Sequence, residues 1–281
     1  MPPTLGQLID TAITRLRDTS PTPRIDVEAL ALHVFQLTRA ALMTRAADTP
    51  TPADTEHFRA CIERRHAGEP VAYITGRREF WSLDLAVSPA TLIPRPETEL
   101  LVEQALAHIP ADAAHIVIDL GTGSGAIALA IAHERPSARV VGTDCSRDAI
   151  AIATANAARL HLTNVELRHG DWFTPLADLR AHVIVSNPPY VRADDPHLTR
   201  GDVRFEPREA LASGENGLDA IRRIITTAPQ YLTQGGWILL EHAPDQAPAV
   251  TALLRQYGFV DDARHTDLLG NNRLSMARRP T

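Results

Sequence analysis

Apolar residues in the first quarter of the chain recur every three or four positions, the spacing that places them on one face of a helix. The clearest stripe covers residues 5–16, and Asp26 is positioned to cap a second helix. Further stripes predict helices near 39–46 and 52–66. Residues 1–75 are therefore expected to form a small bundle of about four helices.

The pattern changes in residues 76–93. Apolar and polar side chains alternate from Phe80 to Val87, which is typical of a half-exposed strand. We expect a β-hairpin linker over residues 76–93 that joins the bundle to a second domain.

From residue 94 onward, short apolar runs alternate with helical stripes. The predicted strands are 115–120, 138–143, 165–169, 182–186, 237–241, 259–263 and 273–277, and the predicted helices are 97–108, 125–134, 147–160, 217–232 and 246–257. Strands and helices in this order form a mostly parallel sheet with helices on both faces. Residues 94–281 are therefore expected to be an α/β domain with a Rossmann-like sheet of seven strands.

Composition excludes some classes of protein. The 281 residues are 44% hydrophobic and 22% charged, as in soluble globular proteins. The net charge of −6 argues against bare nucleic acid as the main partner. The sequence shows no apolar run long enough to span a membrane and no signal peptide with a basic start and an apolar core. We therefore expect a protein that is neither membrane-bound nor exported. Cys61 and Cys145 are far apart and form no metal or redox pattern, so we expect no metal and a cytoplasmic location.

A glycine-rich turn follows the first strand of the second domain, which ends at Asp119. The turn contains Gly121, Thr122, Gly123 and Gly125. Glycine allows positive φ and lets a ligand approach the backbone closely. The dinucleotide pattern G-x-G-x-x-G would require glycine at Ala128, so a nicotinamide oxidoreductase is disfavoured. Asp119 would repel a pyrophosphate, but it could meet the cationic end of an amino acid.

Acidic and aromatic residues end the next two predicted strands. Asp144 ends the second strand and stands 25 residues after Asp119 in the sequence. An acidic residue at about this sequence separation can bind a ribose diol. Asp171 could accept a hydrogen bond from an adenine amino group, and Trp172 or Phe173 could pack on the ring. Together with the glycine turn, these features predict S-adenosylmethionine as the cofactor. The alternatives are a purely structural turn, a helix cap at Asp144 and a core position for Trp172.

Asn187-Pro188-Pro189-Tyr190 follows a predicted buried strand and so lies at the carboxyl edge of the sheet, where open α/β sheets bind ligands. The prolines fix the backbone and donate no hydrogen bonds. The Asn187 side-chain oxygen and the Pro188 carbonyl are therefore two acceptors for one –NH2 group. Tyr190 offers a flat face for a planar group. The turn predicts an amide or exocyclic amine as the acceptor, although an ordinary proline turn would also fit.

In combination, these motifs resemble those of class I methyltransferases that act on a planar nitrogen. The chain is more narrowly similar to the HemK-type peptide-chain release factor glutamine methyltransferases. The segments that carry this narrower resemblance are Glu69–Gly76, Phe80-Trp81, Leu92–Glu99, Phe205–Leu211, Gly217-Leu218-Asp219, Glu241-His242 and Gln246. Ala243 and residues 269–273 depart from the family pattern.

The resemblance implies an enzyme that uses S-adenosylmethionine to methylate the glutamine of the Gly-Gly-Gln loop in bacterial release factors. It implies that Asn187, Pro188, Pro189 and Tyr190 carry the chemistry, with Asn187 also bordering the cofactor. Arg95 and Glu97 would order the substrate or the cofactor at the mouth of the site. The same two residues could instead begin a helix, where an acid is favourable.

Other functions stay open at this point. A ribosomal-protein glutamine methyltransferase would carry the same turn, and so would an amino methyltransferase of adenine or guanine in DNA or RNA. The acidic net charge weighs against the nucleic-acid enzyme. The intact Asn-Pro-Pro-Tyr turn weighs against a non-catalytic assembly factor. Among the twelve histidines, His242 is the best candidate for a function because it ends a predicted strand.

Overall fold

A computed structural model describes residues 2–281, which form two compact units. One unit runs to Arg77 and also includes Thr199–Phe205, while the other comprises Arg78–Leu198 and Glu206–Thr281. A short internal segment of the chain thus leaves the second unit, packs within the first and returns.

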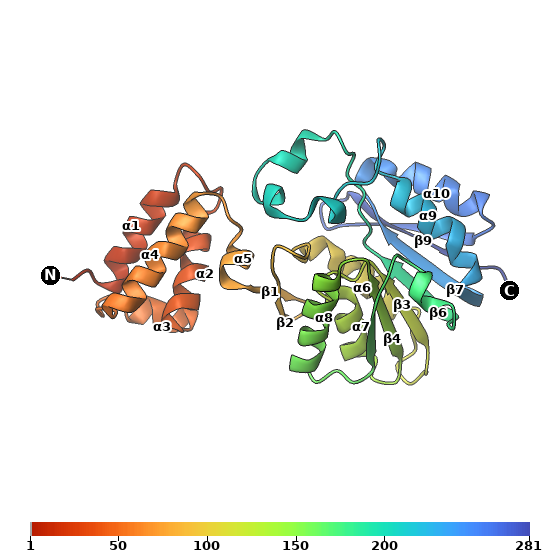
Figure 1. The fold of residues 1–281 in the computed structure, drawn as a ribbon, viewed down its shortest axis with the longest axis horizontal. Helices are drawn as coiled ribbons and strands as arrows, with labels where there is room; N and C mark the ends of the chain where they lie inside the picture. The colour runs from red at the N-terminus through yellow and green to blue at the C-terminus, as the bar shows by residue number, and fades with distance from the viewer. Residues whose placement is uncertain (1) are drawn as a thin grey trace. The chain divides into compact units, whose positions relative to one another are not determined.

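The first unit is a helical bundle, coloured red to orange in Figure 1. Its helices are α1 Leu5–Leu16, α2 Pro23–Phe35, α3 Arg39–Thr44, α4 Pro52–His66 and the short α5 Val71–Thr75. Leu16, Leu30 and Phe58 are among the side chains that fill its core. The four predicted helices are confirmed. The structure adds α5, whose five residues are too few to show a helical stripe.

The prediction that Asp26 caps α2 is wrong. The helix begins earlier, at Pro23, because proline is pre-organised for the first helical position and needs no partner for an N–H group. Asp26 lies inside the first turn, where its carboxylate accepts hydrogen bonds from Ser20 Oγ at 2.7 Å and from Arg65 Nε at 2.6 Å. The carboxylate therefore neutralises a buried guanidinium instead of capping the helix.

Arg65 also holds the internal segment Thr199–Phe205 within the bundle. Its Nη1 donates to Asp202 Oδ1 at 2.8 Å, and the Arg65 side chain is only 5% exposed. Arg204 adds a second link by donating to the carbonyl of Ala67 at 2.8 Å. Because Arg65 also pairs with Asp26 and the Asp202 side chain is 45% exposed, the contact with Asp202 helps to anchor the segment but does not alone neutralise the guanidinium.

The predicted hairpin is present, but its strands are shorter than the alternating pattern. Strand β1 covers Arg77–Phe80 and β2 covers Leu83–Ala86. Between them Trp81 and Ser82 adopt φ values of 52° and 57°, which makes the turn. The expected continuous strand over residues 80–87 is therefore wrong, since alternation continues through the turn and does not mark it.

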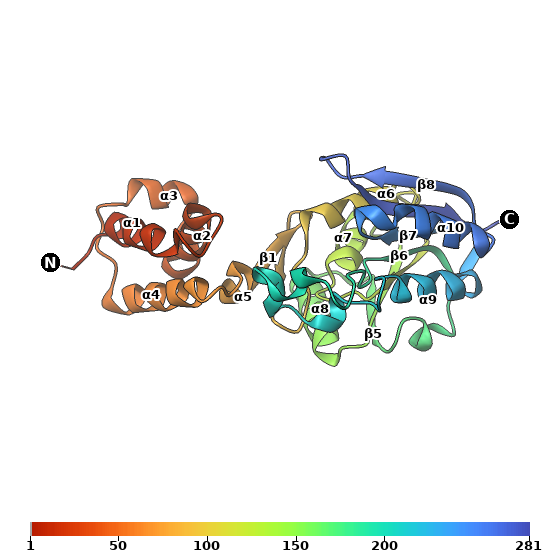
Figure 2. The same cartoon turned by 90° about the horizontal axis from the view of Figure 1, so that it is seen from above.

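The second unit is an α/β domain built on a seven-stranded sheet in the order β5-β4-β3-β6-β7-β9-β8 (Figures 1 and 2). The strands are β3 Ile116–Leu120, β4 Arg139–Asp144, β5 Val165–His169, β6 Ala181–Ser186, β7 Leu232–Glu241, β8 Val260–Thr266 and β9 Asn272–Arg278. The first five pair in parallel, and β9 pairs antiparallel with β7 and β8. The predicted seven-stranded, mostly parallel sheet is confirmed.

Helices cover both faces of this sheet. The helices are α6 Glu99–Leu106, α7 Ala126–Glu134, α8 Arg147–Arg159, α9 Asp219–Thr227 and α10 Ala247–Gln256. One apolar core contains side chains of α6, α7 and α8, and a second contains those of α9 and α10. The helix predicted over residues 217–232 ends early because Ala228–Gln230 forms a 3-10 turn, after which Leu232 pairs with Ala181 and begins β7.

Within residues 2–281, none of the helices has the length and apolar character needed to cross a membrane.

Candidate active site

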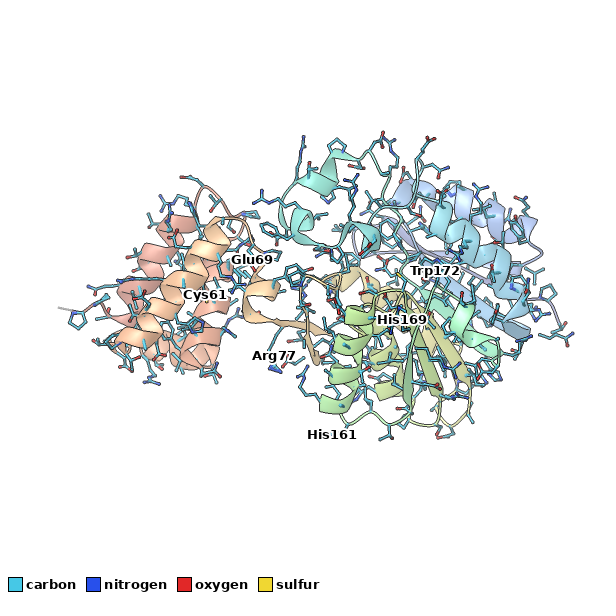
Figure 3. The ribbon with its side chains drawn as sticks, viewed as in Figure 1. Cys61, Glu69, Arg77, His161, His169 and Trp172 are labelled. Carbon is cyan, nitrogen blue, oxygen red and sulfur yellow. The ribbon has the colours of Figure 1, made fainter. Side chains whose placement is uncertain are left out.

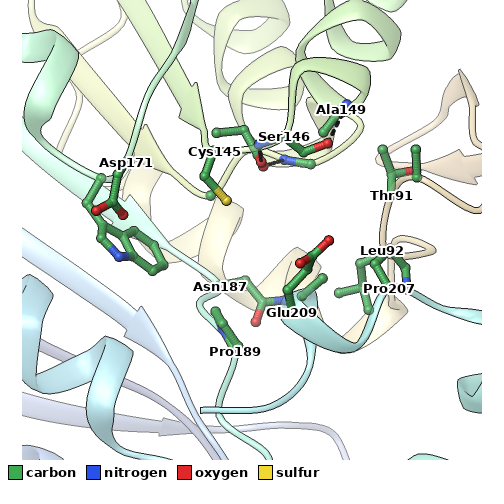
Figure 4. A pocket seen from close by; sticks show the side chains of 16 residues that line it. Thr91, Leu92, Cys145, Ser146, Ala149, Asp171, Asn187, Pro189, Pro207 and Glu209 are labelled. Carbon is green, nitrogen blue, oxygen red and sulfur yellow. Dashed lines mark hydrogen bonds between the residues drawn. The ribbon is translucent and has the colours of Figure 1, made fainter. Parts of the chain in front are cut away.

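A cavity opens at the carboxyl ends of β3, β4 and β6 and beside the loop that follows β5 (Figure 4). Its empty volume, which includes the part open to solvent, is about 770 Å³. The predicted site residues that line it are Gly121, Gly123, Asp144, Asp171, Trp172, Asn187 and Pro189. Those that do not line it are Asp119, Thr122, Gly125, Pro188, Tyr190, Arg95 and Glu97. The topology thus gathers motifs from four strand ends into one site.

The glycine turn forms one wall of the cavity. The backbone N–H groups of Gly121 and Thr122 both donate to the carbonyl of Thr143 at 2.9 Å, which fixes the turn to β4. Gly121 and Gly123 have φ values of 72° and 57°. No atom lies within 4 Å of the point where a Gly123 side chain would begin, so the bare backbone faces open space. A ligand can therefore approach this backbone directly.

Asp119 lies beneath the turn. Its carboxylate is fully buried and accepts a hydrogen bond from Thr122 Oγ1 at 2.6 Å. Burial raises its pKa to about 7, although the Thr122 hydroxyl and the Ala128 N–H oppose the rise. In this position Asp119 shapes the turn, and its direct contact with a cofactor stays a prediction.

Asp144 presents a fixed carboxylate at the end of β4. Its Oδ2 accepts from the Gly123 N–H at 2.9 Å, and its Oδ1 accepts from the Ser146 N–H at 2.8 Å. Each oxygen of an ionised carboxylate can accept a further hydrogen bond. Asp144 therefore couples the glycine turn to the start of α8 and still has acceptor capacity for a diol.

Asp171 (Figure 4) and Trp172 (Figure 3) line the cavity next to the glycine turn. The Trp172 ring packs 3.5 Å from the position that a Gly121 Cβ would occupy, and Trp172 has a positive φ of 47°. Asp171 forms an ion pair with Arg223 at 2.5 Å, and half of its side chain is exposed. The tryptophan both packs on the core and contributes a flat apolar surface to the cavity.

Asn187 and Tyr190 are each tied to a buried residue of another element. Asn187 Nδ2 donates to Thr98 Oγ1 at 3.2 Å, and the Tyr190 hydroxyl donates to Glu241 Oε1 at 3.2 Å. Burial, followed by the nearby Glu241 charge, raises the pKa of Tyr190, so the phenol stays protonated. With its nitrogen engaged, the Asn187 amide has its oxygen left to accept from a ligand.

Arg95 and Glu97 have different positions. Arg95 Nη2 forms an ion pair with Glu206 Oε1 at 2.5 Å, and this links the segment before α6 to the segment that follows Phe205. Glu97 is exposed in a short 3-10 turn over Pro96–Thr98. Their proposed contact with substrate or cofactor stays a prediction.

The cavity also contains residues that sequence reasoning missed. The additional lining residues are Ala90, Thr91, Leu92, Cys145, Ser146, Ala149, Pro207, Glu209 and Ala210. The Cys145 thiol and the Glu209 carboxylate both point into the cavity in Figure 4. The position of Cys145 directly after Asp144, at the end of a predicted strand, could have indicated a place in the site. A cysteine without a second cysteine nearby does not by itself indicate a function.

Cys145 gives a direct test of where the cofactor binds. Alkylation of Cys145 by a maleimide should slow at least tenfold when S-adenosylmethionine or its demethylated product saturates the protein, because the thiol lies in the cavity. Cys61 in α4 is buried in the bundle and serves as the internal control (Figure 3). Burial raises the pKa of Cys145, so the labelling rate is expected to increase up to alkaline pH. Peptide mass spectrometry measures both thiols, and equal labelling with and without ligand would contradict the placement.

His242 has a packing role in this structure. Its ring is fully buried, with Nδ1 at 2.8 Å from the Ala243 carbonyl and Nε2 at 2.8 Å from Ser275 Oγ. Burial is the main cause that lowers its pKa. Both ring nitrogens are used inside the protein, so the residue joins β7 to β9 and has no free nitrogen for a ligand.

Comparison with known proteins adds independent information. The model of the PrmC N-terminal domain matches residues 7–76, and that of the methyltransferase small domain matches residues 96–201. A release factor glutamine methyltransferase of Xylella fastidiosa is 51% identical over 93% of this chain and 95% of its own length. One from Salmonella typhimurium is 48% identical over 95% of this chain and 96% of its own.

The fold has solved counterparts as well. A methyltransferase from Pyrococcus furiosus superimposes with a TM-score of 0.53 at 17% identity, over 79% of this chain and 98% of that one. This likeness shows the fold. The identities to the curated proteins, which extend over nearly the full length of both chains, show that the protein belongs to the release factor glutamine methyltransferase family.

Proposed function

We propose that this protein methylates the side-chain amide nitrogen of the glutamine in the Gly-Gly-Gln motif of bacterial release factors, with S-adenosylmethionine as the methyl donor. The observation that carries the proposal is the Asn187 amide at the cavity wall, whose nitrogen is bonded to Thr98. The names of the curated relatives agree with it.

The residues around the cavity fit S-adenosylmethionine. The open backbone at Gly123 would admit the amino acid part, the Asp144 carboxylate would accept from ribose hydroxyls, and Trp172 would contact the adenine. When bound, this cofactor supplies an electrophilic methyl group on a sulfonium.

A glutamine amide is a poor nucleophile because its nitrogen lone pair is delocalised into the carbonyl. The Asn187 oxygen and the Pro188 carbonyl would accept its two N–H bonds and hold the nitrogen in one direction, while the Tyr190 ring would pack against the amide plane. Positioning of this kind supplies much of the rate when the reacting atoms are held in line. The nitrogen then loses its proton late, to water.

The proposed function is tested by incubation of the protein with labelled S-adenosylmethionine and three acceptors: a release factor, the large-subunit ribosomal proteins, and DNA with RNA. Mass spectrometry should place one methyl group on the Gly-Gly-Gln glutamine. A release factor with that glutamine replaced by alanine is the matched control and should stay unlabelled. Label on ribosomal protein or nucleic acid alone would overturn the assignment.

The helical bundle is proposed to recognise the release factor. The cavity is lined by residues of the α/β unit alone, and a large protein substrate needs contacts beyond one glutamine. The acidic chain can meet a basic surface without binding nucleic acid broadly. A cytoplasmic location follows from this partner and agrees with the two free cysteines.

Removal of the bundle should separate binding from recognition. A chain that starts at Arg78, the first residue of the α/β unit, is expected to bind S-adenosylmethionine with unchanged affinity. It should methylate the full release factor with a kcat/KM lower by about tenfold or more, which corresponds to about 1.4 kcal/mol of lost contact energy. A short Gly-Gly-Gln peptide is the control, because it lacks the remainder of the release factor that the bundle is proposed to bind. Its rate also reports damage from the loss of the Arg65–Asp202 link. Equal efficiency on the full release factor would refute the recognition role.

A further inference from the structure

Two adjacent leucines at the tip of the β8–β9 hairpin are almost fully exposed. Leu268 is 107% exposed and Leu269 is 86% exposed, and neither is part of the apolar cores of the described residues. Figure 2 shows the loop that carries them projecting beyond the end of β8. Single exposed apolar side chains are common, but neighbouring ones on a projecting loop indicate a contact surface. We call these two residues the leucine tip.

Asp267 holds the backbone of the leucine tip in one conformation. Its Oδ1 accepts from the N–H groups of Leu269 at 3.0 Å and Asn271 at 2.9 Å, and its Oδ2 accepts from Arg273 Nε at 3.0 Å. The Gly270 N–H donates to the Asp267 carbonyl at 2.9 Å and closes the turn. None of these bonds uses a leucine side chain, so the turn would form without them. A loop that is already ordered loses little entropy when it binds a partner.

The leucine tip lies at the same edge of the sheet as the Asn-Pro-Pro-Tyr turn. Because β9 runs antiparallel to β7, its first residues stand beside the carboxyl end of β7. There Leu274 pairs with Glu241, and the Glu241 carboxylate accepts from the Tyr190 hydroxyl at 3.2 Å. The His242 N–H, which donates to the Arg273 carbonyl at 3.0 Å, extends this pairing toward the tip. A continuous stretch of paired backbone thus joins the tip to the support of Tyr190.

We propose that the leucine tip is an apolar contact for the release factor, beside the point where the acceptor glutamine enters the site. The inference rests on the proposed function, because a folded release factor that brings its Gly-Gly-Gln loop to the Asn-Pro-Pro-Tyr turn also brings the surface around that loop to this edge of the sheet. The partner surface is therefore an apolar patch next to the loop. A second copy of this chain is the less favoured occupant, since it would compete with the substrate for the same edge.

The test replaces both leucines in the full-length protein. The double variant Leu268→Ser, Leu269→Ser is expected to raise the KM for the full release factor about tenfold, because the burial of two leucine side chains contributes at least this much. Its kcat, its affinity for S-adenosylmethionine and its activity on a short Gly-Gly-Gln peptide should stay at the wild-type values. The double variant Leu268→Met, Leu269→Met keeps the apolar surface and should keep the KM as well.

Tyr257→Ser is the matched control. Tyr257 is another exposed large apolar residue, at 39%, but it follows α10 and precedes β8, so it lies at the opposite edge of the sheet. Its replacement should leave the KM for the release factor unchanged.

Four results would overturn the inference. The first is a wild-type KM for the release factor in the double serine variant. The second is an equal loss of activity on the short peptide, which would mean that the tip supports the site and does not contact the rest of the substrate. The third is a methionine variant as impaired as the serine variant. The fourth is a dimer of the wild-type protein that becomes a monomer in the serine variant while the KM stays unchanged, which would identify a second copy as the occupant. A wild-type enzyme that leaves glutamine unmodified would instead overturn the proposed function, and the inference with it.

Discussion

Replacement of Asn187 by alanine should lower kcat for release factor methylation by about 100-fold or more, while the affinity for S-adenosylmethionine stays near that of the wild-type protein. One well-placed polar group that acts on the reacting centre typically contributes this much. The alanine variant removes an acceptor for the substrate amide and also frees Thr98 from its partner. Steady-state kinetics gives the rate, and calorimetry gives the affinity.

Asn216→Ala is the matched control for this experiment. This variant removes the same kind of side chain at an exposed position outside the cavity, where the side chain accepts one hydrogen bond, from the Leu218 N–H at 3.1 Å. It should keep nearly full activity. An Asn187→Ala protein with a near wild-type rate would remove the Asn-Pro-Pro-Tyr turn from the chemistry.

Replacement of Asp144 by alanine should weaken the binding of the cofactor. We expect the dissociation constant for S-adenosylmethionine to rise about 10- to 100-fold, because charge-assisted hydrogen bonds contribute about 1.5–3 kcal/mol each. The loss has two sources in this structure. The ribose hydroxyls lose their acceptor, and the N–H groups of Gly123 and Ser146 lose the carboxylate that holds the turn in place.

Asp144→Asn and Asp148→Ala separate these sources. The asparagine variant keeps one oxygen at nearly the same place and should bind with intermediate affinity. Asp148 is an exposed acid in the first turn of α8 and does not line the cavity. Asp148→Ala removes the same charge as Asp144→Ala, and this variant should bind S-adenosylmethionine as tightly as the wild-type protein. Unchanged affinity in a folded Asp144→Ala protein would exclude this residue from cofactor binding.

The sheet could be predicted from the sequence because buried parallel strands appear as short apolar runs with little else to explain them. The predicted strand 182–186 differs from β6 only at its first residue, and β6 is buried throughout apart from His182. Boundaries that depend on partners were predicted less well. Leu232 begins β7 because it pairs with Ala181, about fifty residues earlier in the chain, and no local pattern carries that information.

The site was predictable to the extent that its residues stand at strand ends. Asp144, Trp172 and Asn187 met at one cavity because parallel strands bring their carboxyl ends to one edge. Thr98 and Glu241 were not predictable as partners of the Asn-Pro-Pro-Tyr turn. Each has an ordinary local explanation, one near a helix start and the other at a strand end. Their hydrogen bonds to Asn187 and Tyr190 form only once distant segments are packed together.

The attachment of Thr199–Phe205 within the bundle has a consequence for the exchange of domains between relatives. A chimaera that takes only the first 77 residues from another family member would place a foreign surface against the resident Asp202 and Arg204. The guanidinium of Arg65 would keep its bond to Asp26, but its second acid, Asp202, would come from a different ancestor. A graft that preserves these contacts therefore has to carry two separate pieces of the gene, one for the first 77 residues and one for Thr199–Phe205.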